Sequence, residues 1–236
     1  MSIPPNSDHV KAPRRYDSAR RRAQAAQTRL DILDAALSSF LESGYAGSTI
    51  VNVAAGPGVA VETIYRAFGS KGGLFKAVVE AAIAGGAARA AIPVEERPAI
   101  RAMIEETDPH RVLQLHAATQ PGIHGRVGPL NLVLMEAAAN DPELADVKNQ
   151  LEAERLAAMR RIARSLKDRG GLRPEISVDE AGDMLWTVNS PAVYDMLVVQ
   201  RRWSAERYRN WIASTNAHSL LAGRSRRVRR KGPSQA

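Results

Sequence analysis

STIVNVAAGPGVAVETIYRAFGSK, residues 48–71, is the stretch that decides the fold of this 236-residue chain. It predicts a short helix that begins at its first or second residue and ends at the Gly-Pro-Gly of residues 56–58. A second helix is expected over about 61–67, and residues 68–71 end it and begin a third. Two short helices joined by a glycine-bearing turn form a helix-turn-helix, whose second helix fits the major groove of DNA.

The apolar residues of this stretch follow the helical period. Ile50, Val53 and Ala54 share one face of the first helix, and Ile64 and Phe68 share one face of the second. The remaining side chains of the second helix point outward, where the edge of a base pair would lie.

Residues 28–80 resemble the TetR family of bacterial transcriptional regulators, and the resemblance rests on many residues in register. A second, weaker resemblance covers residues 177–221 and involves the last two helices of the family's ligand-binding domain. The matching residues of the first segment are Ile32-Leu33, Ala35-Ala36, Phe40, Gly44-Tyr45, Thr49, Gly58-Val59, Thr63-Ile64-Tyr65, Phe68 and Ser70-Lys71.

The resemblance implies an all-α fold of about nine helices, in which an N-terminal three-helix helix-turn-helix module precedes a helical bundle for ligand binding and dimerisation. We expect a flexible basic arm over residues 1–27 and a DNA-binding domain over 28–73. A ligand-binding and dimerisation domain is expected over 74–222, followed by a disordered basic tail over 223–236.

Glycine, proline and capping residues place the helix ends. The first helix is expected from Gln24 or Thr28 to Ser43, with Gly44 ending it. Pro121-Gly122 and Gly128-Pro129 predict breaks that separate helices over 109–120 and 129–139. Further predictions are an N-cap and N1 proline at Asp141-Pro142, a capping box at Ser177 and Glu180, a kink at Pro191 in a helix that reaches about Gln200, and an N-cap at Ser204.

The net charge of +8 is concentrated at the two ends of the chain. Residues 1–30 hold seven Lys/Arg against two Asp, residues 223–236 hold six bases and no acid, and residues 31–80 hold three bases against five acids. Because DNA affinity depends on neutralising phosphates, we expect the N-terminal arginines to contact DNA, with a solvated basic tail as the alternative. These arginines are Arg14, Arg15, Arg20, Arg21 and Arg22. The C-terminal tail predicts at most non-specific attraction to polyanions.

The resemblance implies a role for each DNA-module position that aligns with the family motif. Tyr65 and Lys71 align with phosphate contacts, and Thr49 with the start of the second helix. Val61, Glu62, Thr63 and Arg66 face the groove, where arginine can read guanine and glutamate can accept from a cytosine amino group. The alternatives are packing and capping for Tyr65 and Thr63, and a solvent-facing position for Glu62.

Three departures from the family pattern concern local structure. Ala60 stands where a serine or threonine N-cap is usual, which is expected to cost about 1 kcal/mol. Pro57 precedes the turn glycine and can displace the turn. Gly72-Gly73 is expected to weaken the start of the fourth helix by roughly 1 kcal/mol per glycine.

Two further expectations concern the C-terminal bundle. Apolar stripes on its last two helices predict a homodimer interface, with packing inside one chain as the alternative; these residues are Leu185, Val188, Ala192, Leu197, Trp211, Ile212 and Leu220. A mixture of apolar and polar residues near Pro191 predicts a site for a small, largely apolar ligand, with an ordinary core as the alternative. The residues are His116, Asn131, Met135, Trp186, Asn189 and Tyr194.

The sequence argues against several other classes of protein. It has no cysteine, its five histidines are scattered, and it lacks a phosphate-binding loop and a nucleophile elbow. We therefore expect no enzyme, no metal and no cofactor. An apolar run long enough to span a membrane and a signal peptide are also missing, so a cytoplasmic location is expected.

The prediction is a homodimeric regulator, more specifically a repressor that binds a pseudo-palindromic double-stranded DNA operator and is released by a small-molecule effector. The alternative is a helical homodimeric adaptor or interaction protein with only non-specific DNA affinity.

Overall fold

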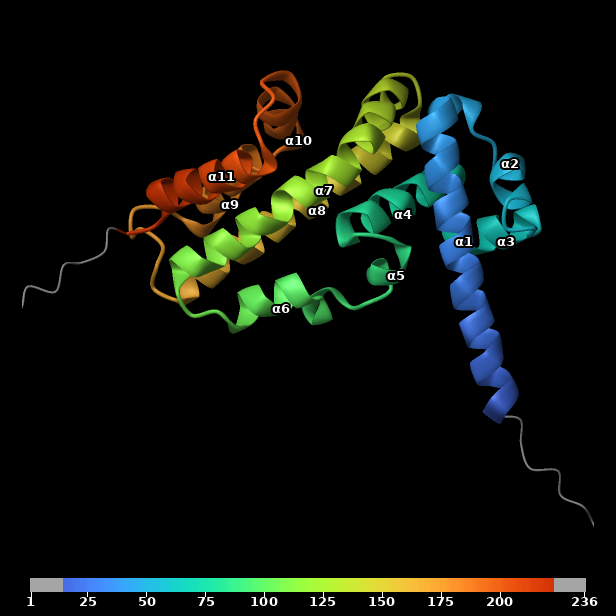
Figure 1. The fold of residues 1–236 in the computed structure, drawn as a ribbon, viewed down its shortest axis with the longest axis horizontal. Helices are drawn as coiled ribbons and strands as arrows, with labels where there is room; N and C mark the ends of the chain where they lie inside the picture. The colour runs from blue at the N-terminus through green and yellow to red at the C-terminus, as the bar shows by residue number, and fades with distance from the viewer. Residues whose placement is uncertain (1–14, 223–236) are drawn as a thin grey trace, which may run out of the picture.

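The computed structural model describes residues 15–222 of the chain, with side chains from residue 20 onward. The described part is built from helices, and its only extended pairing is an isolated bridge between Leu172 and Leu221. This confirms the predicted all-α class (Figure 1). Among the described helices, none combines the length and the apolar character needed to cross a membrane.

The N-terminal part contains α1 (Arg15–Gly47), α2 (Ile50–Ala55), α3 (Val61–Phe68) and α4 (Lys71–Ala84). The short α5 (Ala87–Ala90), a 3₁₀ turn (Val94–Glu96) and α6 (Pro98–Glu105) follow. The long helices α7 (Pro109–Ala138) and α8 (Pro142–Asp168) pack against each other and form the centre of the molecule (Figure 1). The far end consists of α9 (Val178–Val188), α10 (Pro191–Tyr194), a π-helical segment (Asp195–Gln200) and α11 (Ala205–Leu220).

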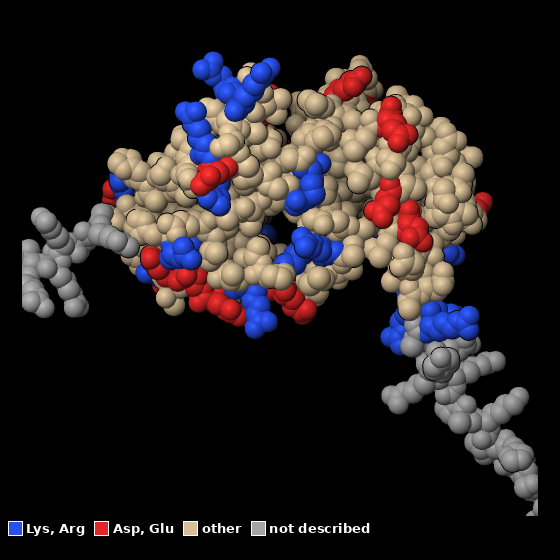
Figure 2. All heavy atoms as spheres, viewed as in Figure 1, with Lys and Arg blue, Asp and Glu red and all other residues tan. Residues whose placement is uncertain are grey.

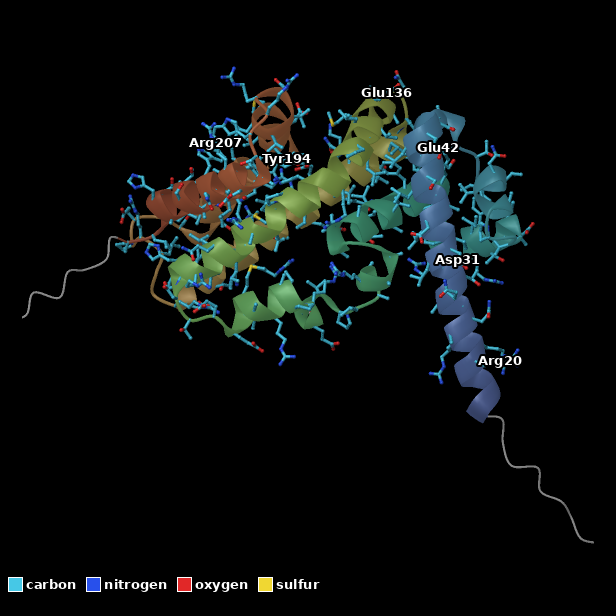
Figure 3. The ribbon with its side chains drawn as sticks, in the orientation of Figure 1. Arg20, Asp31, Glu42, Glu136, Tyr194 and Arg207 are labelled. Carbon is cyan, nitrogen blue, oxygen red and sulfur yellow. The ribbon has the colours of Figure 1, made fainter. Side chains whose placement is uncertain are left out.

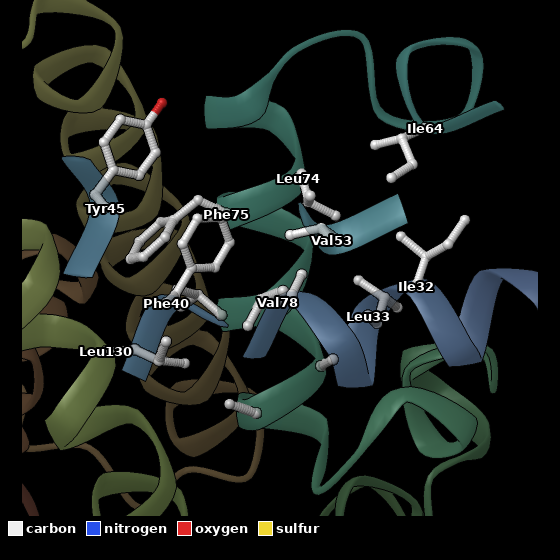
Figure 4. Packing of buried hydrophobic residues seen from close by; sticks show 14 of the residues in the cluster. Ile32, Leu33, Phe40, Tyr45, Val53, Ile64, Leu74, Phe75, Val78 and Leu130 are labelled. Atoms are coloured by element: carbon white, nitrogen blue, oxygen red, sulfur yellow. The ribbon is translucent and has the colours of Figure 1, made fainter. Parts of the chain in front are cut away.

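One hydrophobic core joins the N-terminal helices to the central pair (Figure 4). Phe40 of α1 lies edge-on to Phe75 of α4, with ring centroids 5.0 Å apart. The same cluster includes Leu130 of α7 and Leu144 of α8, both fully buried. The module that carries α2 and α3 is therefore packed directly onto the bundle by apolar contacts.

The first helix begins earlier than the sequence predicted. α1 starts at Arg15, so residues 15–27 are helical and the expected boundary of a flexible arm at residue 27 is wrong. The segment from Arg20 to Gln27 is made of Arg, Ala and Gln, which are strong helix formers that let the helix continue past the core. At the other end, Gly44 has a φ of 67° and interrupts the regular helix, as predicted.

The predicted breaks within residues 109–139 are also wrong. α7 is one helix that contains both Pro121 and Pro129. Proline removes one backbone hydrogen bond from a helix interior, but α7 is held along its length by α4, α8 and α11. Tertiary packing here outweighs the local preference.

At Pro191 the structure shows a break instead of the predicted kink. α9 ends at Val188, and Pro191 is the first residue of α10, where a proline is well tolerated. The hydroxyl of Ser190 accepts a hydrogen bond from the Val193 N–H at 3.2 Å and caps the new helix. Residues 195–200 then continue as a π-helix, a form common at functional sites.

Candidate DNA-binding interface

The turn between α2 and α3 is closed by two backbone hydrogen bonds. The N–H of Val59 donates to the Ala54 carbonyl at 3.0 Å, and the N–H of Gly58 donates to the Ala55 carbonyl at 3.2 Å. Gly58 has a φ of 66°, so the arrangement is a Schellman motif with glycine at its left-handed position. Pro57 is accommodated inside this turn without opening it.

The candidate recognition helix α3 has one buried face and one exposed face. Ile64 is fully buried, whereas Glu62, Tyr65 and Arg66 are exposed, and the Tyr65 side chain is 49% accessible. Val61 and Thr63 are half-buried at its first turn. As expected, Ala60 gives the helix no side-chain cap. Three polar or charged side chains therefore project together from a helix that its buried isoleucine fixes in place.

The start of α2 is capped as the sequence suggests. The Thr49 hydroxyl accepts a hydrogen bond from the Asn52 N–H at 3.1 Å, and Thr49 is exposed. Its hydroxyl thus holds the helix end while remaining accessible at the surface.

Arg29 of α1 holds the far end of α3, a contact that the sequence pattern did not reveal. Its guanidinium carbon lies 4.3 Å from the centre of the Phe68 ring, and its Nη1 donates to the Ala67 carbonyl at 3.3 Å. A cation is favourable at a helix C-terminus because the last carbonyls are unsatisfied there. The two partners lie 38 residues apart in sequence, so no local signal could have paired them.

Lys71 is half-buried at the joint between α4 and α8, by which we mean the contact where Lys71, Tyr45 and Glu143 pack together. Its Nζ is 4.1 Å from the centre of the Tyr45 ring, and the Tyr45 hydroxyl donates to Glu143 Oε2 at 3.2 Å. Burial lowers the pKa of Lys71, and the nearby carboxylates of Asp141 and Glu143 act in the opposite direction. The expected phosphate contact of Lys71 therefore competes with contacts inside the protein.

The glycine pair at the start of α4 is explained by this same joint. A Cβ at Gly72 would lie 2.6 Å from the Glu143 carboxyl carbon, and a Cβ at Gly73 would overlap the Phe68 carbonyl oxygen. The expectation that these glycines merely weaken α4 is incomplete, because a side chain at either position meets its neighbours. The Ser70 hydroxyl compensates in part by accepting from the Gly73 N–H at 2.9 Å.

The basic residues of the N-terminus lie on the projecting end of α1. Arg20, Arg21 and Arg22 are exposed, and Figures 2 and 3 show this end of the helix extending away from the rest of the molecule. Of the other predicted arginines, Arg14 lies outside the described residues, as does the tail 223–236, and Arg15 is described only by its backbone as the first residue of α1.

The residues predicted for a dimer interface divide into two groups. Leu185, Ile212 and Leu220 are fully buried within the single chain, where they belong to its own core. Val188, Leu197 and Trp211 are half-buried, and Ala192 is exposed. The sequence pattern missed three accessible apolar residues in the same region, namely Met184, Met196 and Val199.

The residues predicted for a ligand pocket are only partly brought together. His116 and Asn189 are buried, and the Tyr194 ring is near the rings of His124 and Tyr208, with centroids 5.3 Å and 5.1 Å away. Asn131 and Met135 lie elsewhere, because the fifteen residues from His116 to Asn131 span about 22 Å of helix. Met135 is also half-exposed.

Trp186 faces α8 and not the other pocket candidates. Its Nε1 donates to Glu152 Oε2 at 3.1 Å, and the Arg155 guanidinium lies 4.4 Å above its ring. Trp186 therefore fixes α9 against α8.

Several buried polar atoms between α7, α9 and α11 have no hydrogen-bond partner among the described residues. They are His116 Nδ1, both ring nitrogens of His124, Asn189 Oδ1, the Tyr208 hydroxyl and Asn216 Nδ2. Burial lowers the pKa of His116 and of His124 to about 4, so both rings are neutral near pH 7. The described residues contain no cluster of three or more potential metal ligands.

Comparison with known proteins supports the helix-turn-helix assignment. Residues 32–78 match the family model described as "Bacterial regulatory proteins, tetR family", whereas no curated protein matches the chain. A TetR-family regulator from Mesorhizobium loti MAFF303099 is 20% identical, with a TM-score of 0.61, over 84% of this chain and 99% of its own.

Two similar structures were solved with small molecules. A regulator from Saccharomonospora viridis in complex with choline is 17% identical, with a TM-score of 0.58, over 85% of this chain and 100% of its own. FadR from Bacillus subtilis in complex with stearoyl-CoA is 17% identical, with a TM-score of 0.58, over 79% of this chain and 96% of its own. The resemblance to the TetR family is thereby confirmed: the chain has the fold of TetR-family regulators, and the residues that match the family model, 32–78, include the helix-turn-helix of α2 and α3.

Proposed function

We propose that the protein is a transcriptional repressor that binds a pseudo-palindromic operator as a homodimer and has no catalytic activity. The observation that carries this proposal is the geometry of α3, where Glu62, Tyr65 and Arg66 project from a helix anchored by Ile64. A helix exposed in this way can enter the major groove and place an arginine against guanine.

The charge distribution supports different roles for α3 and for the exposed end of α1. The module from Asp31 to Glu80 carries more acids than bases, so α3 supplies base contacts and little attraction to phosphate. Arg20, Arg21 and Arg22 supply that attraction from the exposed end of α1. Accordingly, we assign DNA binding to α1–α3 and the start of α4, and dimerisation and ligand binding to the helices that follow.

Dimerisation and ligand release complete the proposal. A two-fold operator requires two recognition helices about 34 Å apart, and the accessible Met184, Met196 and Val199 offer an apolar contact for a second copy. A small, largely apolar effector would favour a conformation with a different spacing. The choline and stearoyl-CoA complexes of similar folds support the presence of an effector and leave its chemistry open.

Selection of bound sequences from a random pool of double-stranded DNA tests the proposal. We expect an inverted repeat, and we expect Arg66→Ala to relax the preference at particular base pairs while Tyr65→Ala weakens binding to all sequences alike. Arg161→Ala, which removes an exposed arginine of α8, is the matched control and should leave the selected motif unchanged.

The alternative of a helical adaptor predicts a different result in the same experiment. Binding that falls with salt but enriches no motif would favour the adaptor and contradict the repressor.

A further inference from the structure

A groove of about 330 Å³ lies between α1, α4 and α7. Of the predicted pocket residues, none lines it, although the Tyr194 hydroxyl is 3.7 Å from the Cβ position of its lining residue Gly125. Its walls are mainly aliphatic: Leu33, Leu37 and Leu41 come from α1, Val78 and Ala81 from α4, and Pro129 from α7. Leu33 and Val78 also belong to the core shown in Figure 4. Such a lining suits the body of an apolar molecule.

Two arginines lie near Gly85 at one end of this groove: Arg126 lines the groove, and Arg89 lies beside the same glycine. Around the position of a Cβ on Gly85, Arg89 Nη1 lies at 3.0 Å and Arg126 Nη2 at 3.7 Å. Gly85 has a φ of 94°, a backbone conformation that favours glycine. Because Gly85 has no side chain, both guanidinium groups can lie close to its Cα.

These guanidinium groups lack an acidic partner in the described part of the chain. Neither Arg89 nor Arg126 forms an ion pair within 4 Å there, and the only acid that lines the groove is Asp34. Arg126 does donate to backbone, with its Nε 2.7 Å from the Ala82 carbonyl, and so it is held in place. Two like charges brought together without a carboxylate between them favour an anion.

We propose that this groove binds a small aliphatic or aromatic carboxylate, with the carboxylate at Arg89 and Arg126 and the apolar body between α1 and α4. No local pattern pairs these arginines, because they are 37 positions apart and come together only at the bend after α4. The sequence predicts a small, largely apolar effector, and the groove adds an anionic group to that chemistry.

A ligand in this groove would touch both the DNA-binding module and the bundle. Leu33 and Leu37 lie on the helix that carries the basic end and Arg29, while Arg126 lies on the central helix α7. An effect of the ligand on operator affinity rests on the proposed function, whereas binding of the carboxylate does not. The two are therefore tested separately.

Isothermal titration calorimetry of the full chain with octanoate tests the proposal, with 1-octanol as the uncharged probe of equal length. We expect octanoate to bind at least tenfold more tightly than 1-octanol. Arg89→Gln should weaken octanoate binding by at least tenfold, because it removes one of the two guanidinium charges. Arg89 is exposed, so the variant should keep its fold. Leu41→Trp, which fills the accessible mouth of the groove, should abolish it.

Arg161→Gln is the matched control and should bind octanoate like the unchanged protein. Equal affinity for octanoate and 1-octanol, or an unchanged affinity in Arg89→Gln, would overturn the anionic site. Failure of hexanoate, octanoate and phenylacetate alike to bind at about 1 mM would also overturn it, since a dissociation constant above that corresponds to less than about 4 kcal/mol. Operator binding is measured separately, so loss of DNA binding would count against the proposed function and not against this site.

Discussion

Replacing Gly73 by alanine should destabilise the protein, although the same change usually stabilises a helix. Alanine is favoured over glycine in a helix interior by about 1 kcal/mol. At Gly73, however, the new Cβ would overlap the Phe68 carbonyl oxygen. A backbone oxygen cannot rotate away as a side chain can, so we take the upper end of the usual overpacking cost, about 3 kcal/mol. The expected net loss is about 2 kcal/mol.

Gly125 provides the matched control for this substitution. It lies inside α7, no proline directly follows it, and a Cβ there would make an ordinary contact 3.7 Å from the Tyr194 hydroxyl. Gly125→Ala should therefore gain the helix preference of alanine, about 1 kcal/mol. The same chemical change is thus expected to have opposite signs at two positions of one chain.

Urea unfolding of the three proteins at one pH, followed by circular dichroism, measures both changes. A loss of about 2 kcal/mol in a chain of this size lowers the thermal midpoint by roughly 4–8 °C, which gives a second measurement. Because the overlap presses on the end of α3, Gly73→Ala should also weaken DNA binding, whereas Gly125→Ala should not. If Gly73→Ala were as stable as Gly125→Ala, the close approach of α3 and α4 would be refuted.

Three further outcomes are expected. Ala60→Ser should add the missing N-cap of α3 and stabilise the protein by about 1 kcal/mol in urea unfolding, and no gain would mean that the first turn of α3 is already satisfied. Tyr45→Phe keeps the ring beneath Lys71 but loses the hydrogen bond to Glu143, so a loss of about 1 kcal/mol is expected by the same measurement; an unchanged midpoint would show that this bond contributes nothing. Burial lowers the pKa of both His116 and His124 to about 4, below the ordinary value of about 6.5, so the unfolded chain binds protons that the folded chain does not. Stability should therefore fall as the pH is lowered from about 6.5 towards 4, and the double variant His116→Gln/His124→Gln should show a weaker fall over that interval; an equal fall would contradict the burial of neutral rings.

Local signals predicted the helix ends well where the cause is local. The Asp141 side chain accepts from the Leu144 N–H, Ser177 and Glu180 form the predicted capping box, and Ser204 caps α11. Each of these depends on residues within one helical turn, so the sequence contains the whole cause.

The errors occur where distant contacts decide the conformation. Pro121 and Pro129 favour breaks, yet neighbouring helices hold α7 continuous through both. The glycine pair of α4 suggests softness, but its reason is the close approach of Glu143 and of the Phe68 carbonyl.

The same limit applies to the candidate sites. The exposed residues of α3 follow from helical period alone, and the prediction of Glu62 and Arg66 as outward-facing agrees with their exposure. Arg29 against Phe68 and the pair of Arg89 and Arg126 involve partners on different helices. One sequence without its fold does not show which helices become neighbours.

Because α1 is helical from its start, the number of residues between the arginines and the core sets the direction in which the arginine side chains point. In a flexible arm, one inserted residue would alter only the reach of the charges. In α1, one residue inserted between Arg22 and Leu30 would turn the arginine triplet by about 100° around the helix axis while advancing it by only about 1.5 Å. A second insertion would carry the triplet to about 200°, close to the opposite side, and a total of seven would nearly restore the original heading. The basic end of this protein is thus defined by the direction in which its arginines point around the helix axis as well as by their charge.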